Sequence, residues 1–308
     1  MKKLLAIAVA AAITLPMTAM ADTKVYGKGH VSVGKQNSVD GLFVQSHSSR
    51  IGLKGSNALD GGLTATHQFE IGYNFIDGST LSPRNSWVGL KGGFGEARIG
   101  RQTTPYSVVD DAAAFTTRND HGLHTFTRTN NALAYINKFG NVGFAVAAVM
   151  AGEVEGGKDS DMISNVLVNY SAGPIYAGLA FQGMPDDAAG NSVDAGTKIA
   201  LAYKGANYGV GLASEKLPGS GDAVNTIAGK YSFGKAYFAG QFGKNKDAEL
   251  EQKTIEIGYG LGKGTKTYFE YEILDNAVAG TPATATTPAV AASTVEVKTA
   301  RVGLVHSF

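Results

Sequence analysis

The sequence predicts an all-β fold, a closed antiparallel transmembrane β-barrel of sixteen strands. Three observations lead to this prediction. Segments throughout the chain alternate apolar and polar residues, their connections alternate between tight turns and long polar loops, and a tyrosine precedes each of five tight turns. The alternation gives each strand two unlike faces, and the other two patterns give the barrel one end with short turns and an aromatic border.

Residues 1–21 have the pattern of a secretory signal peptide. Two lysines precede an apolar run from Leu4 to Leu15, Pro16 ends the run, and Ala19-Met20-Ala21 supplies small residues for cleavage after Ala21. The run is shorter than the roughly 20 apolar residues that a spanning helix needs. A mature chain that spans a membrane therefore has to use strands, and the barrel is expected to occupy residues 22–308.

Composition narrows the class of protein. The chain has 41 glycines, 13 tyrosines and 14 phenylalanines but no cysteine, so disulfides do not stabilise it. Without residues 1–21, 25 basic residues stand against 26 acidic ones, a net charge of −1 that argues against a nucleic-acid partner. A soluble β-sandwich fits this composition as well as a barrel does, so the order of the residues has to decide.

Strict alternation marks the strands. From residue 62 to residue 75 the odd positions carry apolar or aromatic side chains, apart from His67, and the even positions carry mostly glycine or polar residues. The same rhythm runs through 197–203 and 265–273. A helix would not keep every second position apolar in this way, so these segments are predicted to be strands with one apolar and one polar face.

The connections between strands are of two kinds. Tight ones lie at 138–141, 171–174, 204–207, 232–234 and 261–264, and all contain the Gly, Asn or Pro that hairpin turns require. Long polar connections include 151–161, 183–195 and 244–251. Short turns at one end and long loops at the other are typical of outer-membrane barrels, whose turns face the periplasm.

A tyrosine stands just before each of the five tight turns, on the apolar parity of its strand. These residues are Tyr135, Tyr170, Tyr203, Tyr231 and Tyr259, and the final Phe308 has the same parity. Tyrosine prefers a membrane boundary because its ring is apolar and its hydroxyl needs a polar partner. We interpret the set as a periplasmic aromatic girdle; the alternative is a row of core tyrosines in a soluble sheet.

Counting strands between the connections gives sixteen, an even number that returns the chain to the side where it began. Closure leaves no unpaired backbone edge in lipid, where each unsatisfied group costs several kcal/mol. The lumen of a barrel of this size is too wide for side chains to fill, so it is expected to hold water.

Five segments resemble strands of the Gram-negative trimeric general porins. SRIGLKGS at 49–56 and WVGLKGGFG at 87–95 are similar to the second and fourth strands, ARIGRQTTP at 97–105 to the strand that enters the third loop, and RTNNALAY at 128–135 to the strand that leaves it. RVGLVHSF at 301–308 resembles the terminal assembly signal ending in Phe308, with His306 in place of the usual apolar or aromatic residue. The resemblance covers the whole mature chain.

The resemblance implies trimerisation and a third loop, residues 103–127, that folds inward to narrow the pore. The sequence supports this independently, since the loop is long and carries Tyr106, Phe115 and Phe126, whose rings need a wall to pack on. Arg84, Val88 and Leu90 share a parity, so an inward Arg84 would bring Val88 and Leu90 inward as seats for the loop.

The parity of each strand also predicts which charges face the lumen. Arg50 and Lys54 face inward against Ile51 and Leu53, as do Arg98 and Arg128 on their strands. The resemblance places Arg50, Arg84 and Arg128 in a basic cluster opposite the third loop, with carboxylates of Asp110 and Asp111 facing them. The constriction is therefore expected to comprise Arg50, Arg84, Arg98, Arg128, Asp110 and Asp111, whose transverse field orients dipolar solutes. Alternatively, some of these arginines only pair with strand acids such as Glu70 or Glu96.

Further charged side chains are expected to line the lumen. They are Lys28, His30, Lys54, Glu70, Glu96, Lys198, Lys230, Glu270, Glu272 and Arg301.

The first five strands have the least regular outward faces. Gly27, Gly29, His67, Trp87 and Arg101 are expected there, and His and Arg are poorly suited to lipid. We expect these strands at the centre of a homotrimer, with the other strands against outer-membrane lipid. Phe308 is expected to be read by the barrel-assembly machinery.

No cofactor, metal site or enzymatic activity is expected. The S-x-x-K matches at 32–35 and 232–235 lie at strand ends or turns rather than at the start of a helix. The pair His121 and His124 beside Asp120 lacks further ligands nearby. The function expected is passive diffusion of ions and small hydrophilic solutes; the alternatives are a substrate-selective uptake channel, a barrel adhesin or structural anchor, and a barrel hydrolase. Residues 274–294, rich in Ala, Thr and Pro, are expected to form a low-complexity extracellular loop.

Overall fold

The computed structural model describes residues 23–78, 81–118, 123–125, 127–150, 162–187, 189–278 and 293–308. The predicted signal peptide, the loop at 151–161 and Phe126 lie outside the described residues. Both ends of the predicted loop at 274–294 belong to strands: β16 continues to Val278, and β17 begins at Ser293.

Seventeen strands form one antiparallel sheet. They are β1 (Lys24–Gln36), β2 (Phe43–Ser46), β3 (Arg50–Ala58), β4 (Thr64–Tyr73), β5 (Leu81–Gly92), β6 (Gly95–Thr103), β7 (Arg128–Phe139), β8 (Val142–Val149), β9 (Ile163–Ala172), β10 (Ile175–Gly183), β11 (Gly196–Lys204), β12 (Tyr208–Lys216), β13 (Ala223–Phe233), β14 (Ala236–Asn245), β15 (Leu250–Gly262), β16 (Thr265–Val278) and β17 (Ser293–Ser307).

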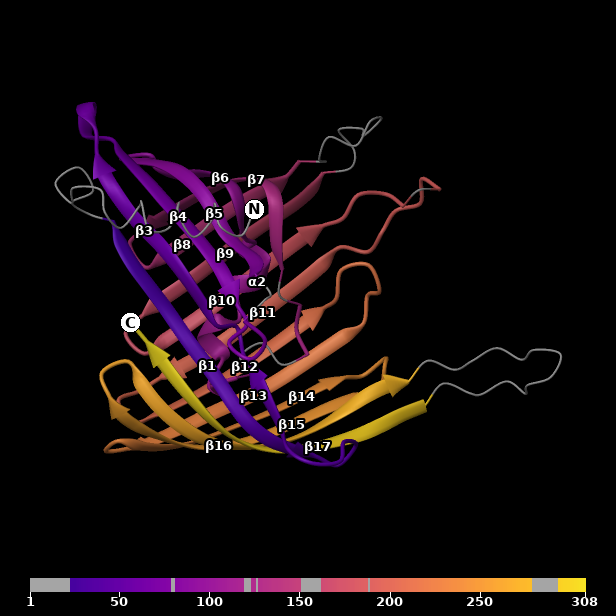
Figure 1. Ribbon diagram of the computed structural model, residues 1–308. Helices are drawn as coiled ribbons and strands as arrows, with labels where there is room; N and C mark the ends of the chain where they lie inside the picture. Colours follow the sequence, from indigo (N-terminus) through magenta and orange to yellow (C-terminus); the bar gives the residue numbers. More distant parts are fainter. Residues whose placement is uncertain are drawn as a thin grey trace.

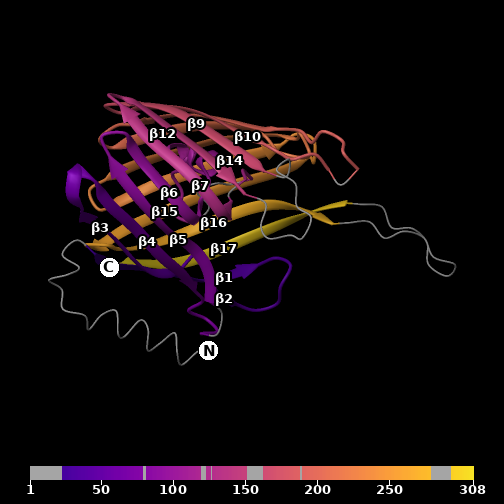
Figure 2. The same cartoon turned by 90° about the horizontal axis from the view of Figure 1, so that it is seen from above.

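The sheet closes on itself as a barrel of sixteen strands (Figures 1 and 2). β2 and β3 pair in succession with the same neighbour, β1, so together they fill one position in the barrel. Between them Ser48 adopts a left-handed backbone with φ of 48°, and this break separates the two halves. β1 also pairs with β17, which joins the first and last strands and confirms the predicted closure.

The two faces of the barrel are inverted relative to a soluble protein. On β15, the outward Ile255 and Ile257 are 62% and 50% exposed, while Glu256 between them is 1% exposed. Outward Leu201, Leu212 and the residues paired with them continue the same exposed apolar surface around the barrel. Because lipid rather than water suits such a surface, the alternation that predicted the strands also accounts for their environment.

A bulge in β5 makes one parity prediction wrong. The register between β4 and β5 shifts between Phe69 and Ile71, so that both Arg84 and Asn85 are available to the lumen. Beyond this shift Val88 is 65% exposed and Leu90 39% exposed on the outer face, while Trp87 faces inward and its indole donates to the Gln68 side chain at 3.1 Å. Val88 and Leu90 therefore do not seat the third loop, and Trp87 is not part of the outer face.

The ends of the barrel differ as expected. Gly140, Gly173, Gly234 and Gly264 occupy the tight turns with φ between 55° and 70°, a conformation that glycine adopts at little cost. We call this the short-turn end, and the opposite end, where connections such as 184–195 lie, the long-loop end (Figure 1). The five predicted girdle tyrosines lie toward the short-turn end, and Tyr170, Tyr231 and Tyr259 are well exposed.

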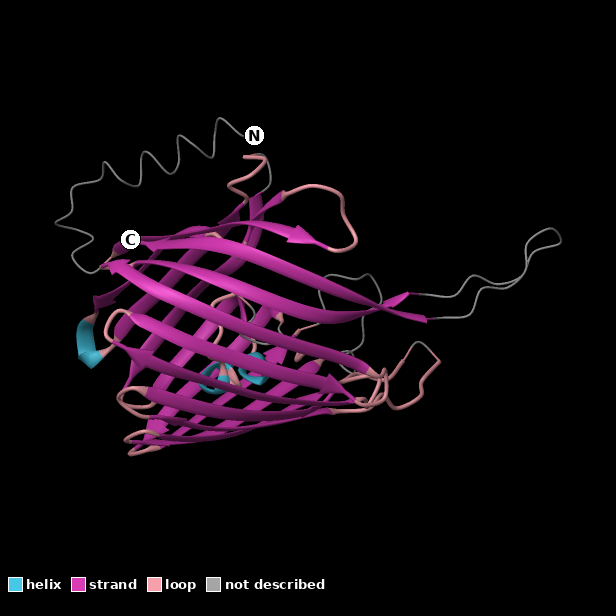
Figure 3. Ribbon diagram, turned by 90° about the horizontal axis from the view of Figure 1, so that it is seen from below, coloured by secondary structure: helices cyan, strands magenta, loops and turns pink. Residues whose placement is uncertain are grey.

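The segment between β6 and β7 lies inside the barrel, where Figure 3 shows its two short helices. These are α2 (Pro105–Val108), whose first turn is capped by Thr104, and the 3-10 turn η2 (Asp111–Ala113). A third short helix, η1 (Asp60–Gly62), connects β3 and β4. None of the helices in the described residues has the length and apolar character needed to cross a membrane.

Candidate functional site

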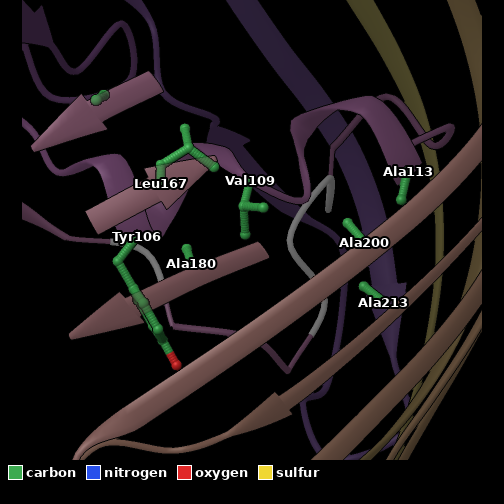
Figure 4. Close-up of a cluster of buried hydrophobic side chains, with 8 residues drawn as sticks. Tyr106, Val109, Ala113, Leu167, Ala180, Ala200 and Ala213 are labelled. Atoms are coloured by element: carbon green, nitrogen blue, oxygen red, sulfur yellow. The ribbon is translucent and has the colours of Figure 1, made fainter. Parts of the chain in front are cut away.

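The described parts of the inward segment between β6 and β7, residues 104–118, 123–125 and 127, begin by packing on the inner wall formed by β9 to β12. Tyr106 and Val109 are fully buried against Leu167, Ala180 and Ala200 (Figure 4). The Tyr106 hydroxyl donates to the Lys216 carbonyl at 3.2 Å, and the Tyr176 hydroxyl of β10 donates to the Val109 carbonyl at 2.8 Å. We call this segment the lumen loop.

Glycines in the wall create the space that the loop fills. A Cβ on Gly211 would lie 2.5 Å from the Cα of Ala113, and one on Gly209 would overlap the ring of Phe115. Side chains at either position would therefore push the loop away from the wall. The predicted role of Tyr106 and Phe115 in seating the loop agrees with this packing, although the seat is β9–β12 rather than β5.

Beyond Phe115 the loop crosses to β15 and β16. The Thr117 amide donates to a Glu256 carboxylate oxygen at 2.8 Å. Arg118 donates to Glu270 at 2.8 Å and also to Glu272. Arg301 of β17 donates to Glu272 at 3.2 Å and lies 3.3 Å from Glu270.

Arg118 therefore ties the loop to the wall through two carboxylates. Burial disfavours its charged form, but Glu272 and Glu270 outweigh this and raise the pKa of Arg118 above its usual value. Arg118 was not among the residues predicted from the sequence. The available signal was the pair Glu270 and Glu272, two inward acids on one strand that require cations opposite them.

The return of the loop is held by a second buried group of charges. The His124 ring nitrogen Nδ1 and the Thr125 amide lie 2.9 Å from a Glu215 oxygen. Lys198 donates to the Thr125 carbonyl at 2.8 Å and lies 3.4 Å from Asp110. Asp110 is thus 3% exposed and directed at the β11 wall, so the expectation that it faces the arginine cluster is wrong.

The opposite wall carries the basic cluster. Glu70 of β4 accepts from Arg84 and lies 3.4 Å from Arg50. Arg128 lies beside them and, together with Asp111 of the loop, lines an open space of about 440 Å³. The structure therefore brings together four of the six residues predicted for the constriction: Arg50, Arg84, Arg128 and Asp111. Arg118 and Lys28 line the same space.

Arg98 does not join this cluster. Its guanidinium forms two hydrogen bonds with Glu96, at 2.9 and 2.8 Å, and lies 4.1 Å above the Trp87 ring. This is the alternative in which an arginine only pairs with a strand acid, here Glu96. Parity placed Arg98 on the correct face but could not give its height along the barrel, which is nearer the short-turn end.

The other residues expected in the lumen lie on the inner face. Lys28 lies opposite Arg50, Lys54 lies 4.9 Å above the Tyr26 ring, and Lys230 lies 3.8 Å above the Tyr237 ring. The remaining members form ion pairs or hydrogen bonds there: His30, Glu70, Glu96, Lys198, Glu270, Glu272 and Arg301.

Two histidines lie close together on the inner face of the first strands. His30 is 2.7 Å from the Tyr268 hydroxyl, and His47 is 2.7 Å from the Ser32 hydroxyl. Their ring centroids are 4.7 Å apart. Within the described residues no group of three or more His, Cys, Asp or Glu side chains could hold a metal ion; Asp120 and His121 lie outside those residues.

Polar residues interrupt the outward face of the first strands. His67 is 3.0 Å from the Thr23 hydroxyl. Arg101 donates to Asn130 at 2.8 Å and lies opposite Ser86, which in turn lies opposite the exposed Phe69. Arg101 therefore has the outward parity that was predicted.

The family model described as Gram-negative porin matches residues 6–278. The major outer membrane protein P.IB of Neisseria meningitidis serogroup A is 33% identical over 132 residues, which span 39% of each chain. A chitoporin of Vibrio furnissii is 30% identical over 146 residues, 40% of this chain and 39% of its own length. The matched segments thus span well under half the length of these curated relatives.

Solved structures extend the likeness of the fold. The anion-selective porin from Comamonas acidovorans superposes with a TM-score of 0.69 and 22% identity, covering 93% of this chain and 99% of that one. OmpT of Vibrio cholerae, in its trimer form, gives a TM-score of 0.67 and 15% identity over 93% and 99% of the two chains. The exposed apolar outer face of the barrel, the family match and the likeness to the major outer membrane protein of Neisseria locate the barrel in the outer membrane. The chain is a member of the Gram-negative porin family.

Proposed function

We propose that this chain forms a water-filled channel through which ions and small hydrophilic solutes diffuse passively across the outer membrane. One observation carries the proposal: the inverted barrel holds an open space lined by Arg50, Arg84, Arg128 and Asp111, with apolar side chains directed outward. Membership of the porin family implies a channel rather than an enzyme.

The charges beside the open space support a weak preference for anions. Lys28, Arg50, Arg84, Arg118 and Arg128 line it together with the carboxylates Glu70 and Asp111. Confined ions experience an effective dielectric below that of water, so a small surplus of one sign biases permeation. The anion selectivity named for the Comamonas porin, a structural neighbour, agrees with this direction.

We further propose that three copies assemble through the outer face of the first strands. Val88 and Ile99 there are 65% and 64% exposed, and His67 and Arg101 lie on the same face. An arginine in lipid costs about 2–4 kcal/mol at the bilayer midplane, whereas a subunit interface can pair it. The trimer form of the Vibrio neighbour supports this assembly, and the other strands would contact lipid.

Purified protein in a planar bilayer tests the channel proposal. We expect stepwise conductance in 1 M KCl. Under a KCl gradient, the sign of the reversal potential should show that chloride permeates more readily than potassium. Liposomes that contain the protein should swell when external sugars enter them, and heat-unfolded protein should be inactive in both assays. Absence of conductance from folded protein would overturn the proposal.

A further inference from the structure

The lumen between the loop and the short-turn end has basic side chains on both walls. Lys204, Lys230 and Lys266 project into the lumen from β11, β13 and β16. The residues next to them in the chain, Tyr203, Tyr231 and Thr267, have the outward parity. Lys54 of β3 and Arg98 of β6 occupy the opposite wall. We call these five residues and the space between them the vestibule.

Each of these cations lies over an aromatic ring. Lys54 is 4.9 Å from the centre of the Tyr26 ring, and Arg98 is 4.1 Å from that of Trp87. Lys204 is 5.6 Å from the Phe115 ring of the lumen loop, and the Tyr237 ring has Lys230 at 3.8 Å and Lys266 at 5.6 Å. An aromatic face attracts a cation without carrying a net charge, so it positions the cation and leaves the positive charge in the lumen.

At the loop, in contrast, cations and carboxylates are nearly matched. Arg118 and Arg301 share Glu270 and Glu272, and Lys198 lies between Asp110 and Glu215. At the level of the vestibule the described inward carboxylates are Glu96 of β6, which pairs with Arg98, and Glu256 of β15, against five basic side chains. Glu270 and Glu272 lie further along the inner face of β16, where they pair with Arg118 and Arg301. The positive surplus therefore lies on one side of the loop.

We propose that the vestibule accumulates small inorganic and organic anions and makes conduction depend on the direction of the voltage. This inference rests on the proposed channel function. When the long-loop side is positive, anions enter through the vestibule, where the fixed charges raise their concentration, and supply the rest of the pore. With the opposite voltage they enter from the long-loop end, where the described residues carry no comparable basic surplus, and the pore conducts less.

The test is the current–voltage relation of single channels in symmetric KCl. We expect larger current with the long-loop side positive at 0.1 M KCl, where fixed charges act over about 10 Å. The ratio of the currents at equal and opposite voltages should approach one in 1 M KCl, where the Debye length is about 3 Å. Because the chain has no cysteine, a single thiol can be introduced by A189C in the exposed loop after β10 and coupled to biotin. Streptavidin added to one chamber then blocks only the channels whose long-loop end faces that chamber, which reports the orientation of each channel.

Two matched triple variants locate the charges responsible. K204Q/K230Q/K266Q removes three vestibule charges, keeps most of each side-chain stem, and should bring the ratio at 0.1 M KCl close to one. K244Q/K253Q/K298Q removes three charges from the outer face, where Lys253 and Lys298 are about half exposed, and should conduct like the wild type.

The outcomes separate the two proposals. No conductance even in 1 M KCl would contradict the channel function itself. Conducting channels with symmetric currents at 0.1 M KCl, or with asymmetry that survives in K204Q/K230Q/K266Q, would overturn the vestibule while leaving the channel intact.

Discussion

The phenyl ring of Phe308 lies directly over Gly27, at the seam where the last strand meets the first. The Gly27 amide donates to the Phe308 carbonyl at 3.0 Å, and the Phe308 amide donates to the Gly27 carbonyl at 3.1 Å. A Cβ on Gly27 would overlap the ring. Phe308 itself is 63% exposed on the outer face, so the seam is closed by backbone pairing and covered by one aromatic ring that remains accessible from the membrane side.

Deleting Phe308 should sharply lower the yield of the outer-membrane form without preventing synthesis or export. The deletion removes two backbone hydrogen bonds at the seam and the aromatic terminus that we propose the barrel-assembly machinery reads. Quantitative immunoblotting of outer-membrane and periplasmic fractions measures this. F308Y, which keeps the ring, is the control and should assemble normally. Wild-type levels of barrel in the deletion strain would contradict the prediction.

Replacing Arg118 should loosen the lumen loop. R118Q leaves Glu270 and Glu272 with Arg301 as their shared partner, and removing one member of a buried ion pair costs about 3–5 kcal/mol. The cost here is at the lower end or below, because the Arg118 side chain is 16% exposed. We expect noisier open-channel current and a lower temperature at which heating dissociates the proposed trimer.

The matched control for Arg118 is R98Q. It removes the same charge and a comparable carboxylate pair from the wall, but Arg98 does not hold the loop. Its open-channel noise should equal that of the wild type. Equal noise in R118Q and R98Q would show that Arg118 does not restrain the loop.

Replacing Arg50 and Arg128 together with alanine should move the reversal potential toward cations. Both line the open space beside Asp111, and after their loss Glu70 is balanced by Arg84. The measurement is the reversal potential under a fixed KCl gradient. K244A/K246A, which removes two basic residues of the outer surface beyond the lumen, serves as the control. An unchanged potential in R50A/R128A would mean that this cluster does not control permeation.

Cysteines placed on the outer face should map the subunit interface. V88C and I99C introduce thiols on the proposed interface, and I257C introduces one on β15, outside the first strands, at a residue that is 50% exposed. We expect crosslinked oligomers from V88C or I99C after treatment with short bis-maleimides, and none from I257C. The opposite pattern would move the interface to strands β11 to β15.

Period-two alternation was sufficient to predict the strands, the lumen-facing charges and the closure of the barrel. It failed where a bulge changed the parity, so Trp87, Val88 and Leu90 were assigned to the wrong faces. The contacts of the loop were also beyond reach, because they join residues far apart in the chain. Asp110 turns to Lys198, 88 residues away, and Arg118 reaches Glu270, 152 residues away. Parity gives the face of a strand but not the height of its side chains, which is why Arg98 was placed in the constriction.

The central claim is that the charged lumen beside the loop is an open aqueous path. The most direct test is the single-channel conductance of the folded wild-type protein in 1 M KCl, where screening suppresses the effect of fixed charges. We expect discrete steps whose current rises linearly with voltage. A folded barrel that inserts into the bilayer and yet passes no current would contradict this claim.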